Sequence, residues 1–86
     1  MKRRTALMKL PSYAPATFLD GLEARMRLKN DAALARELDV APALLSRIRN
    51  RHLPISAALL LSIHESTQIA IAELRRMMGD SRRLFS

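Results

Sequence analysis

The sequence predicts an all-α protein, folded as a compact bundle of about five short helices. Three observations support this fold class. Apolar residues recur at intervals of three and four in several segments, which is the spacing of one helix face. No segment sustains the alternation of apolar and polar residues that marks a β-strand. Residues that start or stop helices stand between the periodic segments.

The chain length is that of one small domain. With 86 residues, it buries only a modest share of its surface. Residues 1–16 are predicted to form a basic, flexible arm, because they contain two prolines and no sustained helical spacing. Residues 17–79 are assigned to the helical domain, and residues 80–86 to a frayed tail.

The first helix is expected to start near Phe18. Thr17 is followed three residues later by Asp20, which is a variant of the capping box that starts helices. The inner face of this helix consists of apolar residues at helical spacing. They are Phe18, Leu19, Leu22, Met26 and Leu28.

The second and third helices are expected to lie close together in the chain. Asn30 or Asp31 caps the second helix, which then runs to about Leu38. Residues 39–41 form a short turn. Pro42 suits the first position of the third helix, where its missing N–H group costs nothing.

The later helices are bounded by similar signals. The third helix is expected to end near Arg51, because a proline three residues later disfavours helical geometry before it. Ser56 caps a fourth helix over about residues 57–66. A fifth helix covers about residues 70–78, and Gly79 is suited to stop it.

The charge of the chain indicates a polyanionic partner. The net charge is +7, which favours nucleic acid first and an anionic membrane surface second. Three zones are basic: residues 1–16 carry +4, residues 41–55 carry +3 and residues 73–86 carry +2. The two intervening zones carry −1 each, so only some surfaces are expected to face a polyanion.

Several classes of protein are disfavoured by what the sequence lacks. There is no cysteine, hence no disulfide framework and no thiolate metal site. No apolar run approaches the roughly 18 residues of a membrane span, and the basic N-terminus has too short an apolar stretch for an export signal. No nucleophile–base pair, metal triad or glycine-rich phosphate loop is present. We therefore expect no enzyme activity, no metal, no cofactor, no small-molecule ligand and no membrane association. The three aromatic residues are too scattered to stack single-stranded bases.

The third helix has two chemically different sides. Leu44, Leu45 and Ile48 fall on one side at about 100° per residue. The other side carries small and polar residues that suit the floor of the DNA major groove. The residues of this side expected to contact bases are Ala43, Ser46, Arg47 and Asn50. Those near the helix end, expected to contact phosphates, are Arg49, Arg51 and His52.

Each polar residue of this side has a known partner in DNA. Arg47 can bond guanine O6 and N7 with two hydrogen bonds, and Asn50 can do the same to adenine N6 and N7. Ala43 can touch a thymine methyl group. An alternative for Asn50 is to cap the end of its own helix. No acidic residue lies between Asp39 and Glu65, so a polyanion meets no local repulsion there.

These residues resemble the Cro/C1-type helix-turn-helix family, also called the lambda-repressor-like or XRE-type family of bacterial and phage regulators. The resemblance covers about residues 17–79, including residues 53–55 and 72–74. It implies a lambda-repressor-like bundle containing a helix-turn-helix whose second helix reads the groove. The front of that helix, which the resemblance implies contacts bases, consists of Pro42, Ala43, Ser46, Arg47 and Asn50. The residues that would pack this motif are Leu34, Ala35, Leu38, Val40, Leu45 and Ile48. Several of these packing residues match the sequence pattern of the family, and so do Ser46, Arg49 and Asn50.

Two positions depart from the family pattern. Asp39 stands in the turn where glycine is usual, and aspartate tolerates the left-handed conformation better than most residues. Arg51 stands after the Arg-Asn pair where glycine is frequent. That second departure affects where the third helix ends.

The expected function is sequence-specific binding of double-stranded DNA as a cytoplasmic, nucleoid-associated transcriptional regulator such as a repressor. A homodimer on a palindromic operator is expected, because the fourth and fifth helices carry more apolar residues than one small core needs. The residues assigned to this dimer interface are Leu59, Ile63, Ile71, Leu74 and Met78. The alternative is that they fill the core of the monomer. The alternative function is an antitoxin or another module that binds a toxin or other partner protein through the same domain.

Overall fold

A computed structural model describes residues 6–82. These residues form six helices and contain no β-strand, so the all-α fold class is confirmed, with one helix more than expected. The helices are α1 (Ala6–Lys9), α2 (Pro15–Met26), α3 (Asp31–Leu38), α4 (Pro42–Arg49), α5 (Ala57–Thr67) and α6 (Ile71–Met77). Within the described residues, no helix has the length and hydropathy that crossing a membrane requires.

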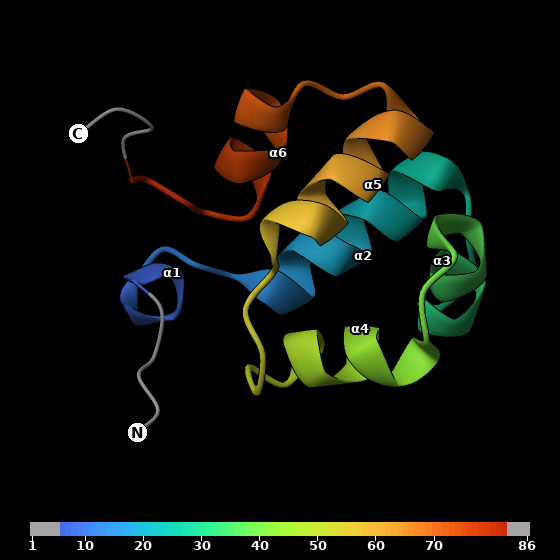
Figure 1. The fold of residues 1–86 in the computed structure, drawn as a ribbon, viewed down its shortest axis with the longest axis horizontal. Helices are drawn as coiled ribbons and strands as arrows, with labels where there is room; N and C mark the ends of the chain where they lie inside the picture. The colour runs from blue at the N-terminus through green and yellow to red at the C-terminus, as the bar shows by residue number, and fades with distance from the viewer. Residues whose placement is uncertain (1–5, 83–86) are drawn as a thin grey trace.

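The helices surround one apolar core. In Figure 1, α2 and α5 cross the middle of the view, α4 runs along the lower edge, α6 lies at the upper edge, and α1 and α3 stand at opposite sides. α4 packs against α2 and α3, while α5 packs against α3 and α6. The largest fully buried side chains are Phe18, Leu19, Leu22, Leu34, Leu45, Ile48, Ile63, Leu74 and Met78. Because α2, α3, α4, α5 and α6 all contribute, each helix orients its neighbours.

α2 begins earlier than the capping-box pattern predicted. It starts at Pro15, after Ala14, and Thr17 and Asp20 lie inside the helix. The prediction of a start near Phe18 was therefore wrong. A proline in the first turn gives up no hydrogen bond, and it presets the helical φ angle. Of the predicted inner face, Phe18, Leu19 and Leu22 are buried. Met26 and Leu28 are half-buried against the core, and Leu28 lies beyond the end of α2.

The connection between α3 and α4 follows the local signals. The Oδ1 atom of Asn30 accepts a hydrogen bond from the N–H of Ala33 at 2.9 Å, so the predicted cap is confirmed. α3 ends at Asp39, whose φ of 59° is left-handed. The N–H of Val40 then donates to the carbonyl of Ala35 at 2.9 Å. This pairing closes the end of α3 and turns the chain toward α4.

α4 is shorter than predicted. It ends at Arg49 with Asn50 as its cap, and Arg51 takes a left-handed φ of 63°. The N–H groups of Arg51 and His52 donate to the carbonyls of Ile48 and Arg47 at 3.0 and 2.8 Å. These two bonds form a Schellman motif, which stops a helix at the residue before the left-handed one.

The predicted signals around α5 and α6 are present. The Oγ atom of Ser56 accepts a hydrogen bond from the N–H of Leu59 at 3.1 Å, which confirms the cap of α5. α5 extends to Thr67, one residue beyond the predicted end. α6 ends at Met77, and Gly79 adopts the left-handed φ of 81° that the predicted stop requires.

The N-terminal segment differs from the expected flexible arm over residues 6–16. Leu7 and Tyr13 are 3% and 2% exposed, so both belong to the core. The Ser12 hydroxyl donates to the carbonyl of Gly79 at 2.6 Å, and the N–H of Ala14 donates to the carbonyl of Met78 at 3.0 Å. These contacts reach across most of the chain length, which is why no local pattern reveals them. The rest of the expected arm, residues 1–5, lies outside the described residues.

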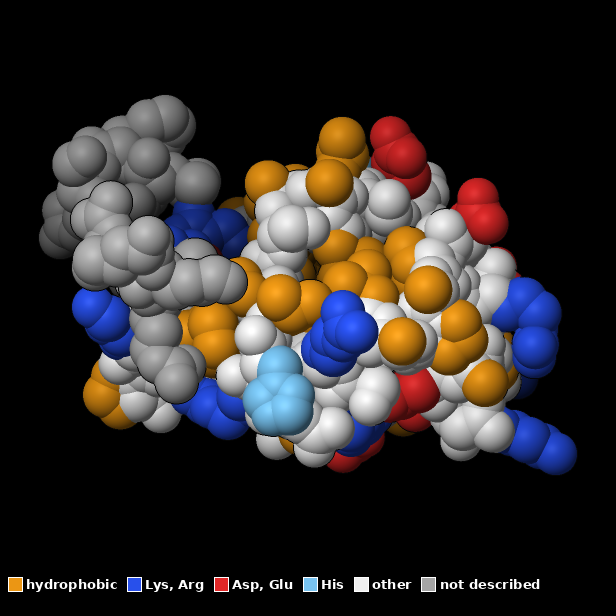
Figure 2. All heavy atoms as spheres, turned by 60° about the horizontal axis from the view of Figure 1, so that its bottom comes forward, with side chains coloured by type: hydrophobic (Ala, Val, Ile, Leu, Met, Phe, Trp, Pro, Cys, Tyr) orange, Lys and Arg blue, Asp and Glu red, His pale blue; other side chains and the backbone are white. Residues whose placement is uncertain are grey.

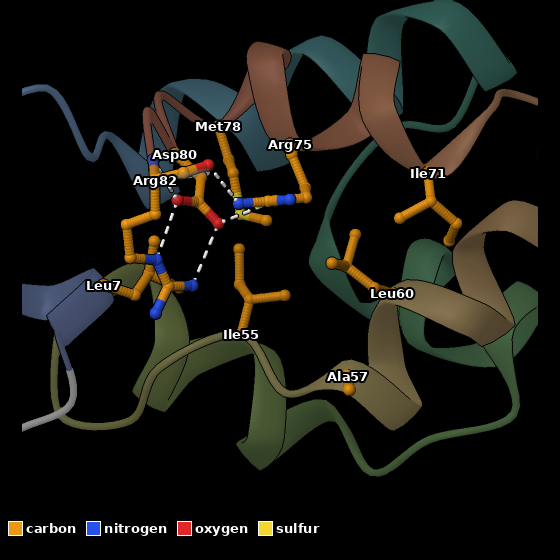
Figure 3. Close-up of a pocket in the computed structure, with 9 residues that line it drawn as sticks. All are labelled: Leu7, Ile55, Ala57, Leu60, Ile71, Arg75, Met78, Asp80 and Arg82. Atoms are coloured by element: carbon orange, nitrogen blue, oxygen red, sulfur yellow. Dashed lines mark hydrogen bonds and ion pairs between the residues drawn. The ribbon is translucent and has the colours of Figure 1, made fainter. Parts of the chain in front are cut away.

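The segment after α6 is also packed, where a frayed tail was expected. The carboxylate of Asp80 accepts hydrogen bonds from Arg75 Nε at 3.0 Å and Arg82 Nε at 2.9 Å. These two guanidinium groups, Arg82 first, hold the pKa of Asp80 well below its usual range. Figure 3 shows this cluster at one end of a pocket of about 370 Å³, whose other walls include Leu60 and Ile71. Residues 83–86 of the predicted tail lie outside the described part of the chain.

The expected dimer interface is not available on the surface. Four of its five residues, Leu59, Ile63, Leu74 and Met78, are at most 4% exposed. Ile71 is half-buried. The four buried residues fill the core of the single chain, as the alternative interpretation had it, so the assignment of an interface to these four was wrong. Among the described residues, Leu61 is the one large hydrophobic side chain that is clearly exposed, at 51%.

Candidate nucleic-acid interface

α4 turns one side to the core and the other to solvent. Leu45 and Ile48 are fully buried, and Leu44 is half-buried against the core. Because α4 packs on α2 and α3 through this side, its opposite side cannot turn inward. The five residues predicted to contact bases, Pro42, Ala43, Ser46, Arg47 and Asn50, are all exposed.

The residues assigned to packing lie between α3 and α4. Leu34, Ala35 and Leu38 are at most 5% exposed. Val40, in the turn, is half-buried and packs against the same core. The small side chain of Ala35 is 1% exposed, and a small residue lets two helices approach closely. The orientation of α4 is therefore determined by an apolar contact that excludes water.

The molecular face that contains α4 combines apolar and basic side chains. Figure 2 shows hydrophobic side chains across the centre of this face, with Lys and Arg side chains around them and one near the middle. Acidic side chains on the same view lie at the upper right, in the lower middle and at the lower margin. A surface of this kind suits a polyanion that offers both charge and apolar contact points.

Arg47 is the available cation of the α4 face. Its side chain is exposed, and its guanidinium forms no hydrogen bond or ion pair with the described residues. Ser46 beside it is exposed and offers a hydroxyl group. α4 has eight residues, and an α-helix with its side chains is about 10–12 Å across, comparable to the width of the major groove.

Asn50 and His52 lie at the C-terminal end of this face. The Asn50 side-chain N–H donates to the carbonyl of Ser46 at 2.9 Å, so the amide caps its own helix, as the alternative interpretation had it. To reach a base, the side chain must first swing away from that carbonyl. His52 is exposed, and within residues 6–82 only its backbone N–H has a hydrogen-bond partner, the carbonyl of Arg47.

Arg49 holds α4 to the rest of the molecule. Its Nε and Nη2 atoms donate to the carboxylate of Asp31 at 2.9 and 2.8 Å. Its Nη1 atom donates to Asp20 at 2.8 Å, and Nη2 lies 3.5 Å from Glu23 Oε2. The guanidinium thus joins α4 to α2 and to the first residue of α3. The predicted phosphate contact of Arg49 is replaced by this internal role.

The cluster around Arg49 shifts the pKa values of its members. The bidentate hydrogen bond with Asp31 raises the pKa of Arg49, and the same bond lowers the pKa of Asp31. Burial, reinforced by the neighbouring Asp31, raises the pKa of Glu23 to about 7 even though Arg49 opposes the shift. Glu23 is therefore protonated in a large fraction of molecules near neutral pH.

Arg51 also has internal partners. Its Nη1 and Nη2 atoms donate to the backbone carbonyls of Tyr13 and Met8 at 3.0 and 3.3 Å. Its guanidinium carbon lies 5.4 Å from the centre of the Tyr13 ring, within the range of a cation–π contact. The side chain is therefore engaged with the N-terminal segment, whereas the sequence pattern predicted a phosphate contact.

The internal role of Arg49 was missed, although a signal for it exists in the sequence. Arg49 follows Leu45 by four residues, so both side chains lie on the same face of α4. A cation on a core-facing stripe needs a partner when it is buried. The acidic partners Asp20, Glu23 and Asp31 come from two other helices, and no local rule brings them to Arg49.

The N-terminal end of α4 has a mixed charge. A shallow groove of about 300 Å³ runs beside Pro42 and is also lined by Arg36, Asp39 and Val40. Asp39 and Arg36 bring opposite charges to this groove, whereas the residues after Ser46 include no acid before Glu65. Beyond this groove, the guanidinium of Arg47 has no carboxylate partner among the described residues and is therefore the stronger attraction for a polyanion.

Comparison of the chain with protein-family models, with curated proteins and with solved structures found no match. The chemistry of the α4 face is consequently the basis for inferring a function. That face offers small residues, a hydroxyl and an available guanidinium on a helix whose other side is buried.

Proposed function

We propose that this protein binds double-stranded DNA sequence-specifically by inserting the exposed face of α4 into the major groove, and that it thereby regulates transcription. The observation that carries this proposal is the α4 face itself. Small side chains and the available guanidinium of Arg47 stand together on one exposed side of a short helix. A helix of this width fits the major groove, where each base pair presents a distinct pattern of hydrogen-bonding groups.

The proposed contacts are of two kinds: contacts to bases read the sequence, and contacts to phosphates position the protein on the duplex. Arg47 reads a guanine through O6 and N7, Ser46 bonds either base edge, and Ala43 allows close approach and contacts a thymine methyl group. Positive charge after the helix end attracts phosphates and sets the register without reading sequence. The exposed side chain of His52 supports a contact to phosphate in this proposal.

The rigid mounting of α4 supports this proposal. Arg49 connects α4 to α2 and α3, and the left-handed turns at Asp39 and Arg51 close both ends of the segment. A recognition surface that is ordered before binding loses less entropy in the complex. A homodimer in solution is not required, because two copies can occupy half-sites about 34 Å apart on one duplex.

The test is selection of bound duplexes from a random library at about 150 mM salt, where purely electrostatic capture is weak. We expect an enriched motif with the wild-type protein. Arg47→Ala is expected to lose preference at one base pair, by about 1–3 kcal/mol. Arg76→Ala is the matched control, since it removes one positive charge from α6, at the edge of the molecule opposite α4 in Figure 1.

The contrary outcome is equally specific. Equal weakening by Arg47→Ala on enriched and on scrambled duplexes contradicts the role of Arg47 in reading sequence. An absence of enrichment, with binding that disappears as salt rises, contradicts specific DNA recognition altogether. In that event a protein partner for the same face becomes the leading candidate.

A further inference from the structure

The N-terminal helix is attached to the end of the α4 segment by one side chain. α1 has four residues, too few to be stable alone, so its position depends on what holds it. Leu7 packs into the core. Arg51 donates to the carbonyl of Met8, near the C-terminal end of α1, and to the carbonyl of Tyr13. In Figure 1 the C-terminal end of α4 is turned toward α1.

Arg51 makes these contacts from a strained backbone conformation. Its φ is 63°, a region in which a residue other than glycine costs roughly 1–2 kcal/mol. The carbonyls at the end of a short helix lack partners within the helix, and a cation there also interacts favourably with the helix dipole. The Tyr13 ring under the guanidinium completes the contact. Glycine would relieve the backbone strain at this turn, but it has no side chain to make these contacts.

The contact between Arg51 and α1 brings Lys9 close to the end of the α4 segment. Lys9 is the last residue of α1 and follows Met8, whose carbonyl Arg51 holds. It is exposed, and its ammonium group forms no hydrogen bond or ion pair with the described residues. A cation in this state is available to an external anion, whereas the donors of Arg51 are already in use.

We propose that Arg51 is a positioning residue, which fastens α1 beside the C-terminal end of α4 so that Lys9 contacts a backbone phosphate of the duplex that α4 reads. This inference rests on the proposed function and extends its surface to the N-terminal helix. The contact is to phosphate, so it adds affinity at every sequence and no base preference. Arg51 acts through Lys9, while its own positive charge contributes only at longer range.

The test is a double-mutant cycle with Lys9→Ala, Arg51→Gly and the double variant. Glycine at position 51 keeps the left-handed turn without strain, so the variant retains the end of α4. Dissociation constants are measured on the duplex enriched by the wild-type protein, at several salt concentrations between about 50 and 200 mM. Far-ultraviolet circular dichroism establishes that each variant is folded.

We expect Lys9→Ala to weaken binding roughly three- to tenfold and to lower the slope of log K against log salt by about 0.9. Arg51→Gly should cause at least the same loss, because it releases α1. Adding Lys9→Ala to Arg51→Gly should then cause little further loss, since the contact is already gone. Arg76→Ala controls for removal of a distant positive charge.

Two results overturn the inference while leaving the proposed function intact. One is that Lys9→Ala binds the enriched duplex with the affinity and salt slope of the wild-type protein, while Arg47→Ala no longer recognises that duplex. The other is strict additivity of the two losses, which means that Lys9 acts without help from Arg51. Failure of the wild-type protein to enrich any duplex overturns the proposed function and this inference together, so the two failures are distinguishable.

Discussion

At the scale of single residues, Glu23 is the group most sensitive to solution conditions. Its carboxyl group lies beneath α4, with its side chain 12% exposed, close to Asp31 and Arg49. Burial raises its pKa from 4.5 to about 7. Because the folded-state value lies above the unfolded-state value, the folded protein holds the proton more tightly. The stability that this proton confers is fully present below about pH 4.5 and is lost as pH rises through about 7.

This sign predicts that the free energy of unfolding falls between pH 5 and pH 8. Glutamine resembles the protonated carboxyl group, so Glu23→Gln should remove this decline, which we expect to amount to about 1–3 kcal/mol. Urea denaturation of both proteins at several pH values measures it. Asp31 and Asp80 have lowered pKa values and affect stability only at more acidic pH, so they do not interfere. A decline of equal size in both proteins would contradict the assignment.

The two glycines of the chain are predicted to respond oppositely to alanine. A Cβ atom at Gly79 would lie 1.8 Å from the carbonyl oxygen of Ser12, at a φ of 81°. Gly79→Ala should therefore cost about 2 kcal/mol or more. At Gly21, inside α2, an added Cβ atom meets nothing within 4 Å, and Gly21→Ala should stabilise by about 0.5–1 kcal/mol. Thermal unfolding of both variants tests the pair, and a shift of the same sign in both contradicts it.

At the scale of helices, the same stop recurs with different residues. α2, α3 and α4 each end with a left-handed residue whose N–H and that of the next residue bond back into the helix, at Arg27, Asp39 and Arg51. The end of α6 uses Gly79 in the same way. Hydrogen bonding therefore stops these helices even where the residue is strained, and the strain is tolerated because the turn directs the next helix.

Replacing the strained residue by glycine should stabilise the protein where the side chain has no other role. Arg27 is exposed, and its side chain forms no hydrogen bond with the described residues, so Arg27→Gly should gain about 0.5–1 kcal/mol. Asp39→Gly should gain less, because aspartate tolerates this conformation better. Midpoints of thermal unfolding measure both. A lower midpoint for Arg27→Gly contradicts the interpretation.

The junction of α2, α3 and α4 depends on Arg49. Removing its guanidinium leaves Asp20, Glu23 and Asp31 close together without a compensating charge. We expect Arg49→Ala to lower the free energy of unfolding by about 1–3 kcal/mol, with the upper limit reduced by the exposure of Asp20. Arg47→Ala, on the outer face of the same helix, should change stability by less than about 0.5 kcal/mol. Similar losses in the two variants, measured by urea denaturation, would contradict the internal role of Arg49.

At the scale of the whole molecule, most of the large apolar side chains of α5 and α6 are buried in the core of one chain. Leu61 is the single large exposed hydrophobic residue among residues 6–82, and one such residue does not make a stable interface. We therefore expect a monomer in sedimentation experiments at micromolar concentration. A concentration-dependent dimer would show that another surface mediates self-association, and Leu61→Ser would then test whether α5 is part of it.

Local rules predicted much of the fold and the outward side of the candidate site. Asn30, Pro42 and Ser56 act within one helical turn of their own position, so the starts of α3, α4 and α5 were predicted correctly. Helical spacing likewise identified the buried side of α4, and hence its opposite, exposed side. α1 was not predicted, because Leu7 and Tyr13 are buried by partners far away in the chain.

The sequence by itself determined that the protein is all-α, where most of its helices begin, and which residues of α4 face outward. These properties depend on hydrogen bonds and side-chain spacing within a few residues. Tertiary structure alone decided which groups Arg47, Arg49 and Arg51 meet, although the three are equivalent in charge and stand at alternate positions of the sequence. Their side chains point in different directions. Arg47 meets solvent, Arg49 meets three carboxylates, and Arg51 meets the carbonyls of the N-terminal segment. A charge acquires its role from the groups that the fold brings near it, and folding brings those groups from distant positions in the chain.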